Sequence, residues 1–230
     1  MADIPFEDKI YIVDKILSST KENLRNRDYV IALIREMGLH NDSSINHLYS
    51  PSEQAFLKQF GMLQQPQQLA DALIFLSNFV INKYIEIGTF NGTCFAFIAS
   101  YLKVFNPGIK SRTIDIMVRH NPLMEVEFKK RIDIKFHTGT SDDFIGAKSD
   151  LCFIDADHSY SAVVKDYENI GKYAKLCMFH DIIDEHQTKI NDGGSLRHWK
   201  ELKENENECE YHEFIDHPEN KSNFGIGIKI

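Results

Sequence analysis

The stretch YIEIGTFNGT, residues 84–93, constrains the fold of this 230-residue chain more than any other part of it. An apolar run leads into two spaced glycines, and a second apolar segment follows them. This order predicts a buried strand, a glycine turn and a helix. Gly88 permits a tight turn, and Gly92 lets the backbone approach a ligand where a Cβ atom would collide. Because the Glu86 carboxylate would repel a phosphate, the turn better suits a ligand that carries positive charge and hydroxyl groups.

Composition narrows the class of protein. The net charge of −8 argues against non-specific nucleic-acid binding, which needs a basic surface. No apolar run approaches the length of a membrane span, and the N-terminus has no signal-peptide pattern. The 4 cysteines form no CxxC pair, which favours reduced thiols in the core. We therefore expect a cytoplasmic protein that binds neither nucleic acid nor membrane; the sequence allows a homo-oligomer.

The N-terminal part of the chain is predicted to be helical. The expected elements are helices within residues 6–38, a loop over 39–51, a short helix from Ser52 to Phe60, and a helix from Pro66 to about Asn78. Because the first 60 residues show no strand signal, we predict an N-terminal helical cap over residues 1–64. Residues 65–230 then form the second domain.

Strands and helices alternate after the glycine turn. The expected strands are residues 113–116, 132–136, 151–154 and 176–179, with a helix over about 159–173. Mostly apolar strands separated by helices indicate a parallel sheet that is covered on both faces. Two later strands, 211–215 and 224–230, are joined too closely for a parallel crossover and should be antiparallel. The predicted fold class is α/β: a Rossmann-like, doubly wound, mostly parallel sheet with an antiparallel C-terminal strand pair and the N-terminal cap.

From about residue 65 to the C-terminus the chain resembles class I S-adenosylmethionine-dependent methyltransferases. Their first motif, an acidic residue followed by Gly-x-x-x-Gly, matches Glu86, Gly88 and Gly92. A carboxylate at the end of the family's second strand binds the ribose hydroxyls and matches Asp115. The resemblance implies a cofactor site built from Glu86, Gly88, Thr89, Asn91, Gly92, Asp115, Gly139, Thr140 and Ser141, the last three near the adenine. A nicotinamide-binding unit is disfavoured, because G-x-G-x-x-G is absent.

Chemistry-bearing residues follow the next two strands. Asp155 and His158 come after one strand, and His180 and Asp181 after the other. Ligands of open α/β sheets bind beyond the carboxyl ends of the strands, so both groups should face one crevice. These segments resemble metal-dependent O-methyltransferases of the caffeoyl-CoA type and the macrocin-type sugar enzymes. The resemblance implies that Asp155, His180 and Asp181 bind a divalent cation.

His180 departs from the family, which has a carboxylate there. Mg²⁺ prefers oxygen ligands, whereas imidazole suits softer ions such as Zn²⁺ or Fe²⁺. Three interpretations follow. His180 points away from the ion, the site binds a softer ion, or the site binds no ion. A hydrogen-bonded pair of His180 and Asp181 at a strand end is the alternative without a metal.

His158 and Asp155 are the candidate catalytic residues. A hydroxyl becomes a good nucleophile when its proton leaves, and a cation bound to the oxygen or a nearby imidazole assists that step. A histidine can accept the proton near neutral pH. The caffeoyl-CoA type has a lysine where His158 stands. The alternative readings are a polar residue at a helix start for His158 and a helix cap for Asp157.

Together these features predict an S-adenosylmethionine-dependent O-methyltransferase with divalent-metal and histidine assistance. Its partner would be a small hydroxylated acceptor; the macrocin-type resemblance favours a sugar. His186, Asn191 and Asp192 are candidate acceptor contacts, with a solvated loop as the alternative. The alternative functions are a non-catalytic cofactor-binding or scaffold protein of the same fold and an enzyme of the cephalosporin-hydroxylase type.

Overall fold

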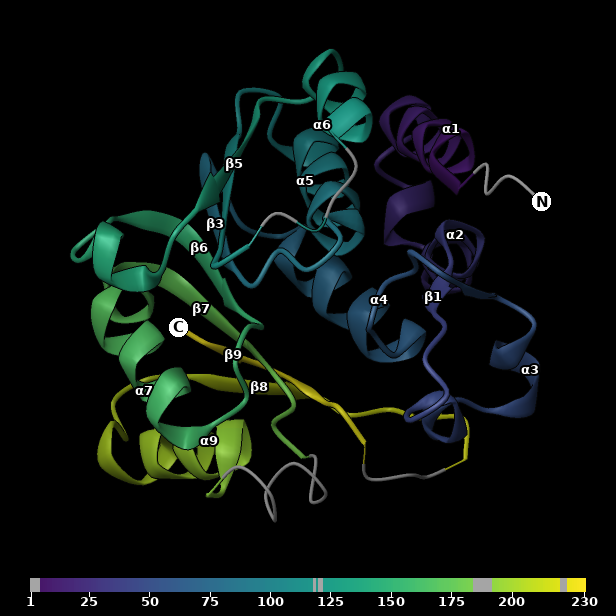
Figure 1. The fold of residues 1–230 in the computed structure, drawn as a ribbon. Coiled ribbons are helices and arrows are strands. Elements are labelled where there is room, and N and C mark those ends of the chain that lie inside the picture. Colours follow the sequence, from purple (N-terminus) through teal and green to yellow (C-terminus); the bar gives the residue numbers. More distant parts are fainter. Residues whose placement is uncertain (1–4, 118, 120–121, 184–191, 220–222) are drawn as a thin grey trace.

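A seven-stranded sheet forms the centre of the computed structural model, which describes residues 5–117, 119, 122–183, 192–219 and 223–230 (Figure 1). Its strands, in spatial order, are β5 (Ile134–Thr138), β4 (Lys110–Asp115), β3 (Lys83–Ile87), β6 (Ser149–Ile154), β7 (Ala174–His180), β9 (Ile226–Lys229) and β8 (Tyr211–Phe214). Neighbouring strands pair in parallel except at β9, which is antiparallel to both β7 and β8. This confirms the predicted doubly wound sheet and its antiparallel C-terminal pair.

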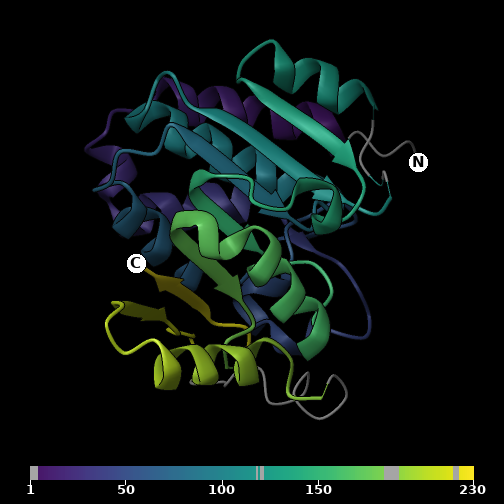
Figure 2. The same ribbon diagram turned by 90° about the vertical axis from the view of Figure 1, so that its left-hand side faces the viewer.

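Helices cover both faces of the sheet (Figure 2). The α-helices of the described residues are α1 (Pro5–Ser18), α2 (Arg27–Met37), α3 (Pro51–Gln54), α4 (Pro66–Leu76), α5 (Thr93–Phe105), α6 (Pro122–Lys129), α7 (Tyr160–Asn169) and α9 (Gly194–Asn205). Successive strand residues point to opposite faces, so Tyr84 packs in a cluster with residues of α1, α4 and α5, while Ile85 packs with residues of α7 and α9. The apolar strands are thus buried on both sides, as a parallel sheet requires.

The N-terminal region contains strands that the sequence did not predict. Leu39–His40 (β1) and Leu57–Lys58 (β2) form a two-stranded parallel sheet, so the expectation of a strand-free first 60 residues is wrong. The expected helix from Ser52 to Phe60 is also wrong, because α3 ends at Gln54. Its cap is Ser50, whose hydroxyl accepts from the Glu53 amide while the Glu53 carboxylate accepts from the Ser50 amide. Two-residue strands are too short to show a periodic pattern.

The helices of the N-terminal region pack directly on the rest of the chain. Apolar residues of α1 and α2 belong to the same cluster as those of α4 and α5. The division at residue 64 stays a prediction.

Two helices differ from the sequence-based expectation. Helix α6 had no counterpart among the expected elements, and α7 ends at Asn169 before a short 3-10 turn at Gly171–Tyr173. Within the described residues, none of the helices has the length and apolar character of a membrane span.

A buried lysine joins α1 to the start of α5. Lys9 is 1 % exposed, and its ammonium donates to the carbonyl of Phe60 and, at 3.1 Å, to the hydroxyl of Thr93. Burial and the nearby Lys58 lower the pKa of Lys9 to about 7. Unfolded lysine titrates near 10.4, so the unfolded chain binds more protons between pH 7 and pH 10. Stability should therefore rise with pH across this window.

We expect the free energy of unfolding of the wild type to increase by ~2–4 kcal/mol from pH 7 to pH 10, relative to Lys9→Met, which has no group to titrate there. Urea denaturation at several pH values measures the difference between the two proteins. Lys110→Met, which changes an exposed lysine at the start of β4, should track the wild type. Parallel pH curves for the wild type and Lys9→Met would contradict the lowered pKa of Lys9 in the folded protein.

Candidate active site

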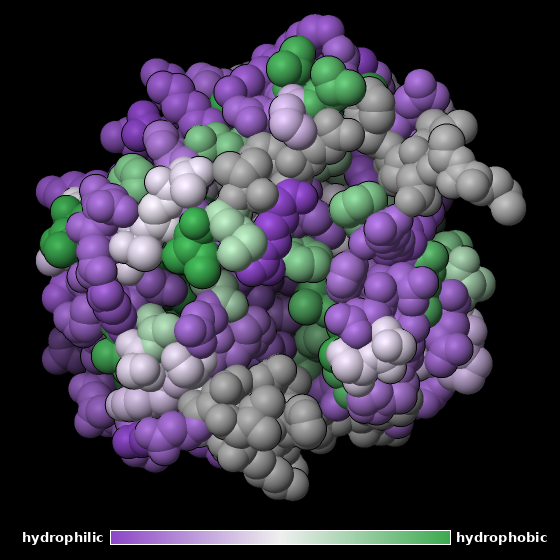
Figure 3. Space-filling model, in the orientation of Figure 1, coloured by the Kyte–Doolittle hydropathy of each residue, from purple (hydrophilic) through white to green (hydrophobic). Residues whose placement is uncertain are grey.

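A cavity of about 520 Å³ opens at the carboxyl ends of β3, β4, β5 and β6. The space-filling view shows a hollow in the middle of this face (Figure 3). β4 lies on one side of β3 and β6 on the other, so the chain order reverses at this point of the sheet. Such switch points are where open α/β sheets bind their ligands.

Gly88 is required where the turn after β3 meets the loop after β6. Its φ is +99°, and a Cβ atom there would lie 1.9 Å from the carbonyl oxygen of Asp155. Only glycine fits this contact. Because Gly88 has no Cβ atom, the turn after β3 and the loop after β6 can lie in contact and form adjoining walls of the cavity. Gly88 also allows the tight turn expected from the sequence.

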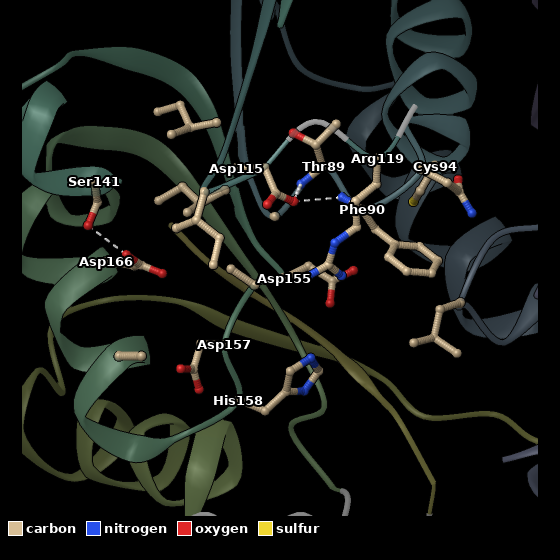
Figure 4. A pocket seen from close by; sticks show the side chains of 18 of the residues that line it. Thr89, Phe90, Cys94, Asp115, Arg119, Ser141, Asp155, Asp157, His158 and Asp166 are labelled. Atoms are coloured by element: carbon tan, nitrogen blue, oxygen red, sulfur yellow. Dashed lines mark hydrogen bonds between the residues drawn. The ribbon is translucent and has the colours of Figure 1, made fainter. Parts of the chain in front are cut away.

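Asp115 binds the glycine turn directly (Figure 4). Its Oδ2 accepts from the amides of Thr89 at 2.9 Å and Phe90 at 2.8 Å, and its Oδ1 accepts from the Met117 amide at 3.1 Å. Asp115 also lines the cavity, so the carboxylate that anchors the turn is part of its wall. Phe90 has φ +49°, uncommon for a residue with a side chain, and Asp115 stabilises this turn.

Two residues of the predicted cofactor motif lie outside the cavity wall. Glu86 is buried, and its carboxyl accepts a hydrogen bond from the Tyr84 hydroxyl. Burial raises its pKa well above the ordinary value. Gly92 is the left-handed N-cap of α5. Neither lines the cavity, whereas Gly88, Thr89 and Asn91 do.

Asn91 connects the glycine turn to the N-terminal region. Its amide nitrogen donates to the carbonyl of Gly61 at 2.9 Å. Residues 61–64, which precede α4, thereby form one wall of the cavity. Within this segment Gln64 is 1 % exposed and donates to Asp155 Oδ2 at 2.8 Å. No sequence signal points to Gln64, because its partner lies 91 positions away.

The wall beyond β5 contains Gly139, Thr140 and Ser141, as the resemblance implied. The Thr140 amide donates to Asp143 at 3.0 Å, and the Ser141 hydroxyl donates to Asp166 of α7 at 2.6 Å. Asp166 also lines the cavity, and sequence reasoning missed it, because one acidic residue on a helix resembles many solvated ones.

Asp155, His158, His180 and Asp181 form one cluster at the ends of β6 and β7. His180 Nδ1 lies 3.1 Å from Asp155 Oδ1 and 3.3 Å from Asp181 Oδ1, and His158 Nδ1 contacts Asp181 Oδ2. The ring nitrogens approach the carboxylates at ion-pair distance without well-aligned hydrogen bonds. Asp155 and His158 line the cavity, whereas His180 and Asp181 lie behind them.

The pairing within this cluster shifts the pKa values of His158, His180 and Asp181. Burial lowers the pKa of His158, but the Asp181 carboxylate outweighs it and raises the value to about 9. The pKa of His180 is likewise raised by Asp155 and Asp181 against the effect of burial. The pKa of Asp181 is lowered by both imidazoles, although burial alone would raise it. His158 is thus charged at neutral pH, unlike the neutral base expected from the sequence.

The predicted divalent-metal site is not supported. Among the described residues, no group of three or more His, Cys, Asp or Glu side chains is arranged to hold a metal ion. An imidazole lies beside each of the carboxylates Asp155 and Asp181. Mg²⁺ prefers a set of oxygen ligands.

Of the three candidate acceptor contacts, the structure describes only Asp192. His186 and Asn191 lie outside the described residues. Asp192 lies 3.4 Å from the guanidinium of Arg197 and does not line the cavity. Arg119, which sequence reasoning did not consider, lines it instead and lies over the ring of Phe90 at 5.8 Å.

Comparison with solved structures shows which fold this chain has. No protein-family model matches the sequence, and no curated protein matches it. Among solved structures, an O-methyltransferase from Bacillus cereus in complex with SAH is similar over 95% of this chain and 94% of its own, at 15% identity and a TM-score of 0.56. TomG, an O-methyltransferase from Streptomyces achromogenes in complex with SAM, is similar over 87% and 95%, at 13% identity and a TM-score of 0.54. The chain therefore has the class I S-adenosylmethionine-dependent methyltransferase fold, as its motifs indicated.

Proposed function

We propose that this protein is an S-adenosylmethionine-dependent O-methyltransferase that acts on a hydroxyl group of a small acceptor. The observation that carries the proposal is the cavity itself. It joins the glycine turn and Asp115 at one end to Asp155, Asp157 and His158 at the other (Figure 4). A site for methyl transfer needs both parts in one space, because the acceptor must meet the cofactor in line.

The residues present fit the cofactor. Gly88 and Thr89 would border its methionine end, Asp115 its ribose, and the segment from Gly139 to Ser141 its adenine. When bound, the cofactor supplies an activated methyl group. The chain must then bind and orient the acceptor and take its proton.

Proton removal is assigned to His158. Its imidazole lies in the cavity wall, and Asp181 behind it fixes the ring and favours its charged form. Asp155, held by Gln64 and His180, presents a carboxylate beside it that can orient the acceptor hydroxyl. These roles use only side chains of the chain itself. A sugar is the favoured acceptor, on the resemblance to the macrocin-type enzymes alone.

An acceptor panel tests the proposal. The purified protein is incubated with S-adenosylmethionine and a set of sugars and phenols, and products are identified by mass spectrometry. We expect one class of hydroxyl compound to gain a methylene unit together with formation of S-adenosylhomocysteine. Gain of an oxygen atom, or no turnover with any acceptor despite cofactor binding, would contradict the proposal. A parallel assay in excess chelator tests the cation that the resemblance implied, because removal of a required ion abolishes turnover.

A more limited prediction concerns Asp115. If its carboxylate accepts a hydrogen bond from the cofactor ribose, Asp115→Ala should weaken S-adenosylmethionine binding by ~1–3 kcal/mol, the range for loss of a charged acceptor. The lost anchor of the glycine turn adds to this effect. Isothermal titration calorimetry measures the change, with Glu168→Ala, an acidic residue of α7 that is paired with Lys172 outside the cavity wall, as the control. Equal affinities of Asp115→Ala and the wild type would remove Asp115 from the cofactor site.

A further inference from the structure

The buried side chain of Lys9 is not explained by packing. Within the described part of the chain, its ammonium donates to two neutral oxygens, the carbonyl of Phe60 and the hydroxyl of Thr93. A second lysine, Lys58, lies close enough to repel it. A cation that is buried against neutral oxygens costs free energy that an apolar side chain of the same length would not. Such costs are concentrated at functional sites.

The contacts of Lys9 join helix α1 to the segment 60–64 and to the start of α5. The Phe60 carbonyl accepts from Lys9 and, at 2.8 Å, from the Thr93 hydroxyl. The next carbonyl, that of Gly61, accepts from the Asn91 side chain at 2.9 Å, and Asn91 accepts from the Thr93 amide at 3.0 Å. Two consecutive carbonyls of the segment are therefore bound to the glycine turn and α5, and Lys9 bonds to both sides of this junction.

The segment that Lys9 holds is a wall of the cavity. Residues 61–64 line the cavity, and Gln64 at their end donates to Asp155 at 2.8 Å. On its other side the segment lies against β1, because a Cβ atom on Gly61 would be 2.1 Å from the carbonyl oxygen of Leu39. The wall is thus fixed from both sides before any ligand arrives. A site that is ordered in advance binds its ligand without the cost of ordering it.

We propose that Lys9 is a positioning residue of the cavity: it holds the wall formed by residues 61–64 against the glycine turn and makes helix α1 a part of the cofactor site. This inference rests on the proposed function for the identity of the ligand. It adds a residue that does not line the cavity and that acts through the Phe60 carbonyl and Thr93.

The test compares stability with ligand binding, so it needs no acceptor. Lys9→Met keeps the length of the side chain and removes its donors. At pH 7 this variant should be at least as stable as the wild type in urea denaturation, because the buried charge is gone. Its affinity for S-adenosylhomocysteine in calorimetry should nevertheless fall by roughly tenfold or more, the scale of one hydrogen bond from a charged group. A residue with only a structural role would not lower binding while stability is kept.

A second variant and a double variant test the route. Thr93→Val removes the other donor to the Phe60 carbonyl and should also weaken binding. Lys9→Met combined with Thr93→Val should lose about as much affinity as the more severe single variant, because residues that act through one contact are not additive. Lys15→Met is the matched control. Lys15 belongs to the same helix but is paired with Glu36 at 2.7 Å, so its substitution should leave the affinity unchanged.

Wild-type affinity in folded Lys9→Met would overturn this inference alone. A Lys9→Met protein that is less stable than the wild type, or that fails to fold by circular dichroism, would also overturn it, because Lys9 would then serve the fold. Single effects that multiply in the double variant would mean that Lys9 does not act through the Phe60 contact. A wild type that does not bind S-adenosylhomocysteine would overturn the proposed function and this inference with it.

Discussion

Gly88→Ala is expected to lower the free energy of unfolding by ~3–5 kcal/mol and to abolish measurable S-adenosylhomocysteine binding. The backbone at this residue has φ +99°, which L side chains rarely adopt, and the new Cβ atom would meet the carbonyl of Asp155 at 1.9 Å. The obstacle is backbone, so no rotamer change relieves it. The glycine turn and the loop that carries Asp155 must separate, and both are walls of the cavity.

Substitutions of two other glycines distinguish the conformational cost of Gly88→Ala from the cost of its steric clash. Gly146 has φ +78° with nothing within 4 Å of its Cβ position, so Gly146→Ala should show only the conformational cost of ~1 kcal/mol. Gly108 has open space and no positive φ, so Gly108→Ala should be close to neutral. Urea denaturation and calorimetry measure all three. A Gly88→Ala protein as stable as Gly146→Ala would mean that the two loops do not touch.

His158→Ala should lower turnover roughly 10²–10⁴-fold at saturating substrates, the range for a positioned general base. His158→Asn should lose as much, because an amide has similar reach but cannot accept the proton. S-adenosylhomocysteine affinity should change little in either variant, since the glycine turn and Asp115 are untouched. Near-wild-type turnover in both variants would make His158 structural and leave proton removal to Asp157.

The pH dependence of turnover distinguishes a His158 that accepts the proton from a His158 with only a structural role. Only the neutral imidazole accepts a proton, and Asp181 raises the pKa of His158 to about 9. Turnover of the wild type should therefore increase with pH through about 9, not through the near-neutral range of a free histidine. Asp181→Asn removes the charge that favours the imidazolium, so the rise should move to lower pH. Proton NMR of the His158 ring measures the same ionisation without an acceptor.

Much of the fold follows from local patterns in the sequence. Apolar runs separated by helical segments determine a covered parallel sheet, and the closeness of the last two strands determines their antiparallel pairing. The carboxyl ends of parallel strands share one edge, so the sequence also implied that Asp115, Asp155 and His158 would gather around one space. The structure brings all three to the cavity.

The sequence signals were insufficient where they were short or non-local. The two-residue strands β1 and β2 exist through pairing with each other, and no periodic pattern marks them. Glu86 has the expected place in the motif, but its strand position directs it into the protein beside Tyr84, away from the cavity. A family motif specifies spacing along the chain and does not specify which way a side chain points.

The sequence by itself determined the succession along the chain of the strands of the large sheet, the glycine turn and the set of titratable residues at the strand ends, because each depends on neighbours along the chain. Only the tertiary structure decided how those residues pair. Gln64 meets Asp155 across 91 positions, Lys9 meets Thr93 across 84, and Ser141 meets Asp166 across 25. Asp181 turns toward His158 through a left-handed φ of +60° that its residue type permits but does not require. These contacts depend on packing between distant segments, and they place two imidazoles against two carboxylates where the resemblance implied metal ligands.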